Sequence, residues 1–235
     1  MTDSPNHVQR LRRLDACAVS DALDKLGLPG VVTHLAQRSS GPGGASRIAG
    51  RAVTMKVGPG QPPAGPPRHL GCSAIEQADS HSVIVVEQRS GVEAGCWGGL
   101  LTLGAKVRGV AGVIADGPLR DVDEAIAYEF PIYSRSLSAR TARGRVVELG
   151  TQVPVTIGVG TGPGLGGEVL VNPGDYVLAD RSAVIFIAAE QIEQVLEAAE
   201  TIVAKEAAMA KAILAGTPMT QVMGGNYEHM LEKSI

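Results

Sequence analysis

The first third of the chain alternates apolar and polar residues in patterns that predict one helix followed by one strand. An apolar face with helical spacing is formed by Leu14, Ala18, Val19, Ala22, Leu23 and Leu26. Asp15 is placed to cap the start of this helix, and Gly27 followed by Pro29 is placed to end it. Apolar residues at 53, 55 and 57 alternate with polar ones, which is typical of a half-buried strand. The Gly- and Pro-rich residues 58–67 then predict a loop.

The middle of the chain alternates short apolar runs with helical segments. Residues 83–86, 110–114 and 155–159 are runs of the kind that buried strands form. Residues 100–108 and 121–128 fit helices between them. This strand–helix alternation predicts an α/β class.

After about residue 145 the pattern changes to strands and turns. Residues 168–171 and 176–178 predict strands on either side of the turn Asn172-Pro173-Gly174-Asp175. From 189 to 214 apolar residues recur at helical intervals, which predicts one helix about 39 Å long at 1.5 Å per residue. Such a helix is long enough to pack on a neighbouring subunit. Two helices separated by a break are an equally good interpretation of the same pattern.

Composition and charge exclude several classes of protein. The chain has 235 residues, which predicts a single domain spanning 1–235. Lys and Arg number 21 against 24 Asp and Glu, so the net charge of −3 gives no general attraction for nucleic acid or for an anionic membrane. The sequence contains no apolar run long enough to predict a membrane span, and no apolar signal core follows its polar start. We therefore expect a cytoplasmic protein. The three cysteines lack CxxC spacing, which argues against a disulfide framework or a cysteine zinc site.

One motif points to a nucleotide site that the context does not support. Residues 162–167 match GxGxxG. A dinucleotide-binding motif needs a helix directly after it, whereas residues 168–171 read as a strand. We therefore do not predict a nucleotide site here.

Two loops are better candidates for a binding site. Gly98 and Gly99 lead into a predicted helix, and residues 116–121 follow a predicted strand and lead into the next helix. Ligands commonly bind where strands of an open α/β sheet end. The glycines allow close approach of a ligand, and the free N–H groups of Gly99, Leu100 and Leu101 at a helix start can hold a carboxylate.

Arg120 and Asp121 add the remaining chemistry that a 2-oxo acid requires. A guanidinium can bind a carboxylate with two hydrogen bonds, and a carboxylate is a preferred ligand of Mg²⁺ or Mn²⁺. The ion can bind the carboxylate and keto oxygens together and stabilise an enolate. The alternative interpretation is structural, because Asp121 with Glu124 also fits a helix capping box.

A family resemblance favours the chemical interpretation. The sequence resembles the RraA-like family in one pattern: Gly99, twenty intervening residues, and then Arg120-Asp121-x-x-Glu124. This pattern is set within Trp97-Gly98-Gly99-Leu100-Leu101 and residues 110–117. That family includes 4-hydroxy-4-methyl-2-oxoglutarate/4-carboxy-4-hydroxy-2-oxoadipate aldolases. The similarity extends from residues 21–23 and 51–54 to residues 172–180 and 227–228.

The resemblance implies a fold, an activity and a site. The fold would be an αββα sandwich of the swivelling β/β/α type, like phosphohistidine domains, with a long C-terminal helix. The activity would be that of a class II pyruvate aldolase acting on a small-molecule 2-oxo acid, with oxaloacetate decarboxylation as a side activity. The chain would form homotrimers or homohexamers with sites between subunits.

The resemblance also assigns roles to individual residues. Main-chain N–H groups of Gly98, Gly99, Leu100 and Leu101 would bind the pyruvoyl group, Arg120 would bind its carboxylate, and Asp121 would be the one direct protein ligand of Mg²⁺ or Mn²⁺. Many relatives have an acidic residue at the position of Gly99. In those relatives the acid is thought to hold a water bound to the metal. Proton transfer in this chain would then depend on another carboxylate, and the candidates are Glu190, Glu193 and Glu197 of a neighbour's long helix.

Two other functions remain open at this stage. The family's namesake binds and inhibits a ribonuclease without catalysis, and retention of Arg120-Asp121 argues against that role for this chain. The label methyltransferase is also used in the family, but no convincing cofactor loop is present.

Overall fold

A computed structural model describes residues 4–61, 64–65, 68–160 and 167–224. Its α-helices are α1 (Ser4–Leu11), α2 (Ala16–Leu26), α3 (Cys72–Gln77), α4 (Gly99–Val107), α5 (Val122–Ala127), α6 (Ile192–Leu214) and α7 (Met219–Val222). Its strands are β1 (Val31–Val32), β2 (Ala36–Ser39), β3 (Ile48–Gly58), β4 (Ser82–Glu87), β5 (Gly112–Leu119), β6 (Ile132–Leu137), β7 (Val147–Thr151), β8 (Val155–Gly158), β9 (Glu168–Val171), β10 (Tyr176–Ala179) and β11 (Val184–Ile187). Short 3₁₀ turns cover Pro42–Gly44 and Ala189–Gln191.

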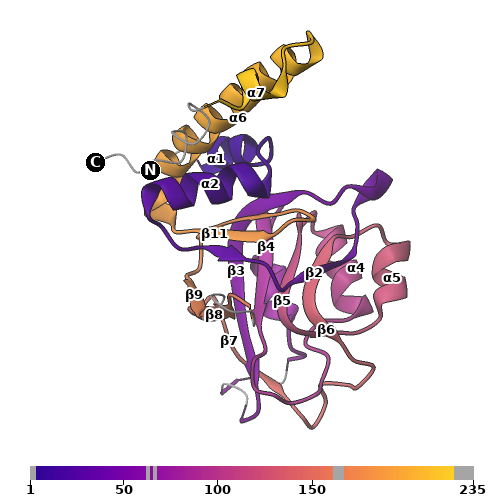
Figure 1. The fold of residues 1–235 in the computed structure, drawn as a ribbon. Coiled ribbons are helices and arrows are strands. Elements are labelled where there is room, and N and C mark those ends of the chain that lie inside the picture. The colour runs from indigo at the N-terminus through magenta and orange to yellow at the C-terminus, as the bar shows by residue number, and fades with distance from the viewer. Residues whose placement is uncertain (1–3, 62–63, 66–67, 161–166, 225–235) are drawn as a thin grey trace.

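A nine-stranded sheet organises the molecule (Figure 1). Its strand order is β1-β11-β10-β3-β4-β5-β6-β2, and β7 pairs with β3 beyond this path. The central strands β3, β4, β5 and β6 are parallel, whereas the pairs at both sides are antiparallel. Strands β8 and β9 form a separate antiparallel hairpin. The carboxyl ends of the parallel strands therefore lie at one edge, where the site is expected.

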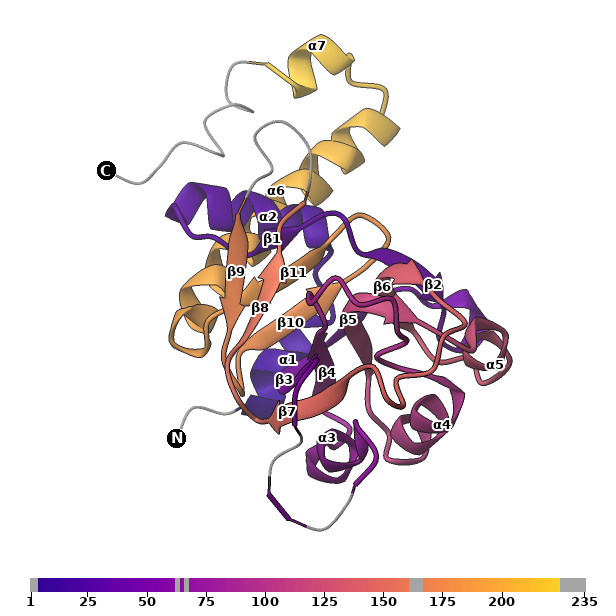
Figure 2. The same cartoon turned by 90° about the horizontal axis from the view of Figure 1, so that it is seen from below.

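Helices cover the two outer sides of this β structure (Figure 2). Helices α3, α4 and α5 pack on the parallel strands around a core that includes Met55, Ile84 and Trp97. Helices α1, α2 and α6 pack on β10 and β11 around a second core. Between the two halves, the β8–β9 hairpin packs on the inner face of the curled sheet in a third core. This arrangement confirms the predicted α/β class with helical layers outside two β layers.

Helix α2 forms for the reasons that its sequence gives. The Asp15 carboxylate accepts a hydrogen bond of 2.9 Å from the N–H of Ala18, and Gly27 takes a left-handed conformation that ends the helix. We expect Asp15→Ala to lower the free energy of unfolding by about 1 kcal/mol, the usual value of a helix cap. Chemical denaturation would measure this difference, and Asp24→Ala on the same helix is a control that leaves the cap in place. An unchanged unfolding midpoint in Asp15→Ala would contradict the capping role.

The long C-terminal helix is continuous. Helix α6 has 23 residues, which corresponds to about 35 Å, and only one 3₁₀ turn precedes it. The two-helix interpretation is therefore wrong for residues 192–214. The buried residues of α6 lie between Ile192 and Ile202, and the rest of the helix projects from the body of the protein (Figure 1).

Helix α1 was not predicted, because its apolar pattern is short and surrounded by charge. Val8 and Leu11 are fully buried, and polar side chains of α1 make further contacts. His7 Nε2 lies 2.8 Å from a carboxylate oxygen of Glu193, and Arg10 binds both Glu193 and Glu200 on α6. The polar start of the chain therefore packs against the first half of α6.

Strand β5 continues further than the sequence predicts. Gly117 and Pro118 read as a loop, yet the strand extends to Leu119. The pairing of β5 with β6 shifts between Ala115 and Pro118, and proline is tolerated in strands at such irregularities. The longer strand carries Arg120 directly to the carboxyl edge of the sheet.

The expectations about a membrane span and about the GxGxxG match can also be compared with the structure. Within the described ranges no helix is long and apolar enough to cross a bilayer. The GxGxxG match spans residues 162–167, of which only Gly167 is among the described residues. Residues 168–171 form β9, so the predicted strand after the motif is confirmed.

Candidate active site

A cavity of about 660 Å³ lies at the carboxyl edge of the parallel strands, between α3, α4 and the segment that follows β5. Its lining contains most of the residues that the sequence singled out: Gly98, Gly99, Leu100, Leu101, Arg120 and Asp121. The predicted convergence of the two loops is therefore confirmed. The individual roles of these residues remain predictions.

Backbone hydrogen bonds hold the two loops in register. The N–H of Arg120 donates to the carbonyl of Trp97 over 3.0 Å, and Trp97 forms a parallel bridge with Leu119. The Trp97 side chain is buried beneath the cavity, and its indole N–H donates to Thr102 Oγ1 of α4 over 3.1 Å. The loop before α4 thus pairs with the end of β5 through one isolated bridge.

Arg120 and Asp121 form an ion pair within the cavity. Arg120 Nε lies 3.1 Å from Asp121 Oδ1, and about a third of each side chain is exposed. Asp121 Oδ2 accepts a hydrogen bond of 2.9 Å from the N–H of Gly99, the first residue of α4. The carboxylate therefore lies at the positive end of the α4 dipole, where a negative charge is stabilised.

The capping-box interpretation of Asp121 is wrong. Asp121 precedes α5, but its side chain makes no capping hydrogen bond to that helix. Its φ of 58° lies in the left-handed region, which few residues other than glycine, asparagine and aspartate adopt. The Asp121 carboxylate contacts Gly99 instead of capping α5, and non-glycine residues in this backbone region are commonly found at functional sites.

Glycines at 95 and 98 allow the close approach of the two loops. A Cβ atom at Gly98 would lie 2.8 Å from Asp121 Oδ2 and 3.0 Å from Arg120 Cγ. A Cβ atom at Gly95 would lie 2.9 Å from both Cγ and Cδ of Arg120. Real Cβ atoms do not approach other atoms this closely, so both positions require glycine for the observed placement of Arg120.

The first turn of α4 offers fewer free N–H groups than the sequence suggested. The Gly99 N–H is occupied by Asp121. The N–H groups of Leu100 and Leu101 have no intrahelical acceptor, as expected in a first turn, and no other acceptor is found for them in the part of the chain that the structure describes. These two groups, with Arg120, are the donors available to a ligand carboxylate.

Asp121 also fits the requirements of a divalent ion. Among the described residues no three His, Cys, Asp or Glu side chains converge into a protein-only metal site. Mg²⁺ and Mn²⁺ do not require one, since Mg²⁺ typically binds one or two carboxylates and completes its shell with water and substrate oxygens. Asp121 uses two of about four acceptor positions for Arg120 and Gly99 and is partly exposed, so positions remain for an ion.

Several cavity residues were missed by sequence reasoning. His69, Cys72, Ile75 and Glu76 reach the cavity from the segment that begins α3, and Thr141 and Ala142 reach it from the loop between β6 and β7. The proline-rich residues before α3 gave no periodic signal. The arginine-rich composition of residues 138–146 is the signal that could have indicated the second loop.

Other candidates have structural partners. The Glu193 carboxylate is engaged by His7 and Arg10 of the same chain, which weakens its candidacy for a neighbour's site. Lys56 and Lys106 are the lysines whose amines could in principle form a Schiff base with a keto group, but Lys56 forms an ion pair with Glu87, and Lys106 donates to the carbonyl of Tyr128. Burial raises the pKa of the Cys96 thiol to about 12, so this cysteine is protonated and unreactive at neutral pH.

Comparison with known proteins places this geometry in a family. Residues 16–186 match the family model RraA-like, described as Aldolase/RraA. The chain belongs to the RraA-like family. The matched range includes both loops of the cavity.

Two curated relatives have similar sequences. Protein DlpA of Legionella pneumophila is 27% identical over 217 residues, which cover 92% of this chain and 33% of DlpA. This chain thus spans only a third of that relative. A protein of Halalkalibacterium halodurans with the provisional name 4-hydroxy-4-methyl-2-oxoglutarate aldolase is 27% identical over 211 residues, with 88% of each chain covered.

Solved structures share the fold. An uncharacterised protein of Pseudomonas syringae pv. tomato has a TM-score of 0.77 at 27% identity, covering 94% of this chain and 98% of the other. RraAS2 of Streptomyces coelicolor is described as an unusual member of the RNase ES inhibitor RraA protein family. It has a TM-score of 0.67 at 22% identity, and the match covers 83% of this chain and 91% of RraAS2. At that identity the second likeness concerns the fold alone.

Proposed function

We propose that this protein is a divalent-metal-dependent pyruvate aldolase. The observation that supports this function is the Arg120–Asp121 pair, which faces a cavity beside the free amides of Leu100 and Leu101. The substrate is a 4-hydroxy-4-substituted 2-oxo acid with two or three carboxylates, and the products are pyruvate and a second oxo acid. Membership of a family with relatives named as aldolases of this type supports the assignment.

Different residues of the cavity bind different parts of the pyruvoyl group. The Arg120 guanidinium and the N–H groups of Leu100 and Leu101 hold the carboxylate, because a guanidinium can bind a carboxylate with two hydrogen bonds and the amides at a helix start bind anions. Asp121 holds Mg²⁺ or Mn²⁺. When bound, the ion supplies Lewis-acid stabilisation of the negative charge that develops on the 2-oxo group.

Cleavage of the substrate requires no oxidant, reductant or second substrate. The bond between C3 and C4 breaks, the C4 hydroxyl loses its proton, and C4 becomes the carbonyl carbon of the second oxo acid. The bonding electron pair stays on the pyruvate fragment as its enolate, which takes up a proton at C3. Decarboxylation of oxaloacetate forms the same enolate, so we expect it as a side activity.

An apolar stripe beside the cavity supports an oligomer. Leu100, Leu103 and Val107 recur on the outer face of α4, and Leu100 is 86% exposed. Exposed apolar patches of this kind mark interaction surfaces. We propose that a second copy of this chain covers the stripe in a homotrimer or homohexamer, so that the cavity lies next to a subunit boundary.

Pyruvate release tests the proposal. With 4-hydroxy-4-methyl-2-oxoglutarate or oxaloacetate and Mg²⁺ or Mn²⁺, we expect pyruvate formation, measured with a coupled lactate dehydrogenase assay. EDTA should remove the activity, and added Mg²⁺ should restore it. Full activity in EDTA would contradict the metal dependence. Absence of pyruvate from every 2-oxo acid tested, together with a stoichiometric ribonuclease partner, would favour the regulatory function instead.

A further inference from the structure

The loop between β6 and β7 borders the cavity and carries three arginines within six residues. Residues 138–146, here called the arginine loop, have the sequence Ser-Ala-Arg-Thr-Ala-Arg-Gly-Arg-Val and contain no acidic residue. Thr141 and Ala142 in its middle line the same cavity as Arg120 and Asp121. The loop therefore borders the proposed substrate site directly.

Backbone hydrogen bonds fix the arginine loop beside Arg120. The N–H of Ser138 donates to the carbonyl of Leu119 over 2.9 Å, and the N–H of Gly95 donates to the carbonyl of Arg140 over 2.9 Å. Gly95 is the same residue on which the Arg120 side chain packs. The start of the loop thus contacts both segments that position Arg120.

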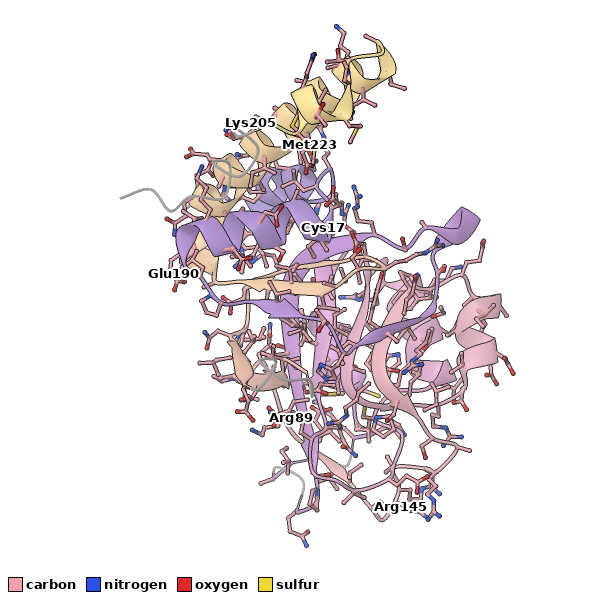
Figure 3. The ribbon with its side chains drawn as sticks, viewed as in Figure 1. Cys17, Arg89, Arg145, Glu190, Lys205 and Met223 are labelled. Carbon is pink, nitrogen blue, oxygen red and sulfur yellow. The ribbon has the colours of Figure 1, made fainter. Side chains whose placement is uncertain are left out.

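The charges at the far side of the loop are not compensated. Arg140 pairs with Glu93 over 3.3 Å, but Arg143 and Arg145 are exposed, and no carboxylate of the described residues lies within 4.0 Å of either. Arg145 Nη1 donates to the carbonyl of Thr141 over 3.1 Å, which closes the loop. Arg145 lies at the end of the molecule opposite the projecting part of α6 (Figure 3).

We propose that the arginine loop recognises the second carboxylate of the substrate, with Arg143 and Arg145 as the residues that determine specificity. The inference rests on the proposed aldolase function and adds to it the residues that select acidic substrates. Arg120 binds the carboxylate next to the keto group, and the arginine loop borders the same cavity through Thr141 and Ala142. Apolar residues such as Leu70 and Ile75 also line the cavity and suit the carbon chain of a substrate. A substrate with a second carboxylate matches a cavity that holds one arginine and is bordered by a basic loop.

The expected loss of kcat/KM is modest because the Arg143 and Arg145 side chains are exposed to solvent. Each exposed charge pair contributes little in water, but uncompensated like charges at a cavity mouth raise the local concentration of an anion and its rate of entry. We expect Arg143→Gln with Arg145→Gln to lower kcat/KM for the dicarboxylate 4-hydroxy-4-methyl-2-oxoglutarate about tenfold at low salt. For the monocarboxylate 4-hydroxy-2-oxopentanoate, which has half the charge, we expect a smaller loss of about threefold, so that the ratio of the two kcat/KM values falls about threefold.

The controls separate this role from general effects of charge and folding. Arg47→Gln with Arg181→Gln removes the same charge from residues that line a different hollow, and we expect no change in the ratio of the two kcat/KM values. Arg143→Gln alone leaves the Arg145 hydrogen bond to Thr141 intact and should give part of the effect. High salt should reduce the preference of the wild-type protein for the dicarboxylate, because exposed charges are screened.

The outcomes distinguish this inference from the proposed function. Equal losses of kcat/KM on both substrates, or an unchanged ratio in the double variant, would overturn the role of the arginine loop while the aldolase function stands. Wild-type protein that releases pyruvate from neither substrate would overturn the aldolase function itself.

Discussion

Replacing Asp121 by asparagine is expected to lower kcat for pyruvate release about a thousandfold while leaving the protein folded, because a metal supplies several kcal/mol of charge stabilisation in such reactions. Asparagine keeps an oxygen that can accept the Gly99 N–H, and it tolerates the positive φ of this position. The substitution therefore removes the charge and keeps the contact with Gly99, whereas Arg120 Nε loses the oxygen to which it donates, because an amide NH2 takes its place. Titration with Mn²⁺ followed by electron paramagnetic resonance should show the corresponding loss of ion binding.

Asp121→Ala provides the contrast. Alanine loses the hydrogen bond to Gly99 and is disfavoured at φ 58°, so we expect a loss of stability of about 1–3 kcal/mol in addition to the loss of activity. Thermal unfolding of both variants separates the two effects. If Asp121→Asn retained most of the wild-type kcat in the presence of Mg²⁺, neither a metal ligand nor an essential charge could be assigned to Asp121.

Much of the fold could be predicted because local pattern and tertiary packing agree there. Helix α2 combines helical apolar spacing with Asp15 at its start and Gly27 at its end, and the structure uses all three. Helix α1 could not be predicted, since it is short and its polar residues are positioned by partners on α6, about 185 residues away in the sequence. Contacts at that separation leave no signal in a local window.

The candidate site was predicted in its location and less well in its detail. Two loops that end neighbouring elements at one sheet edge must lie close together, so the convergence of residues 98–101 with 120–121 followed from the predicted topology. The sequence Arg-Asp-Val-Asp-Glu is equally compatible with a helix cap. The contact of Asp121 with Gly99 and its left-handed backbone, which decide between the two, are properties of the tertiary structure.

Placing a methyl group at position 98 is the second substitution with a large expected effect. In Gly98→Ala the new Cβ would lie 2.8 Å from Asp121 Oδ2 and 3.0 Å from Arg120 Cγ. Alanine is compatible with the extended backbone at this position, with φ −153° and ψ −174°, so the strain falls on the two side chains. We expect kcat/KM for pyruvate release to fall about a hundredfold, since a shift of about 1 Å in a catalytic group has effects of this size.

Gly104→Ala is the matched control on the same helix and in the same cavity. Its Cβ would lie 3.5 Å from Ile75 Cδ1, an ordinary contact, and alanine in a helix is more stable than glycine by about 0.5–1 kcal/mol. We therefore expect Gly104→Ala to unfold at a slightly higher temperature than the wild type, with kcat/KM within about twofold of the wild-type value. Gly99→Ala should fall between the two, because its Cβ would meet Asp121 Cβ at 3.3 Å, a contact that is tight but less close than those at position 98. If Gly98→Ala were as active as Gly104→Ala, the close packing of Gly98 against Arg120 and Asp121 would have no part in the reaction, and the proposed site would have to be reassigned to other residues of the cavity.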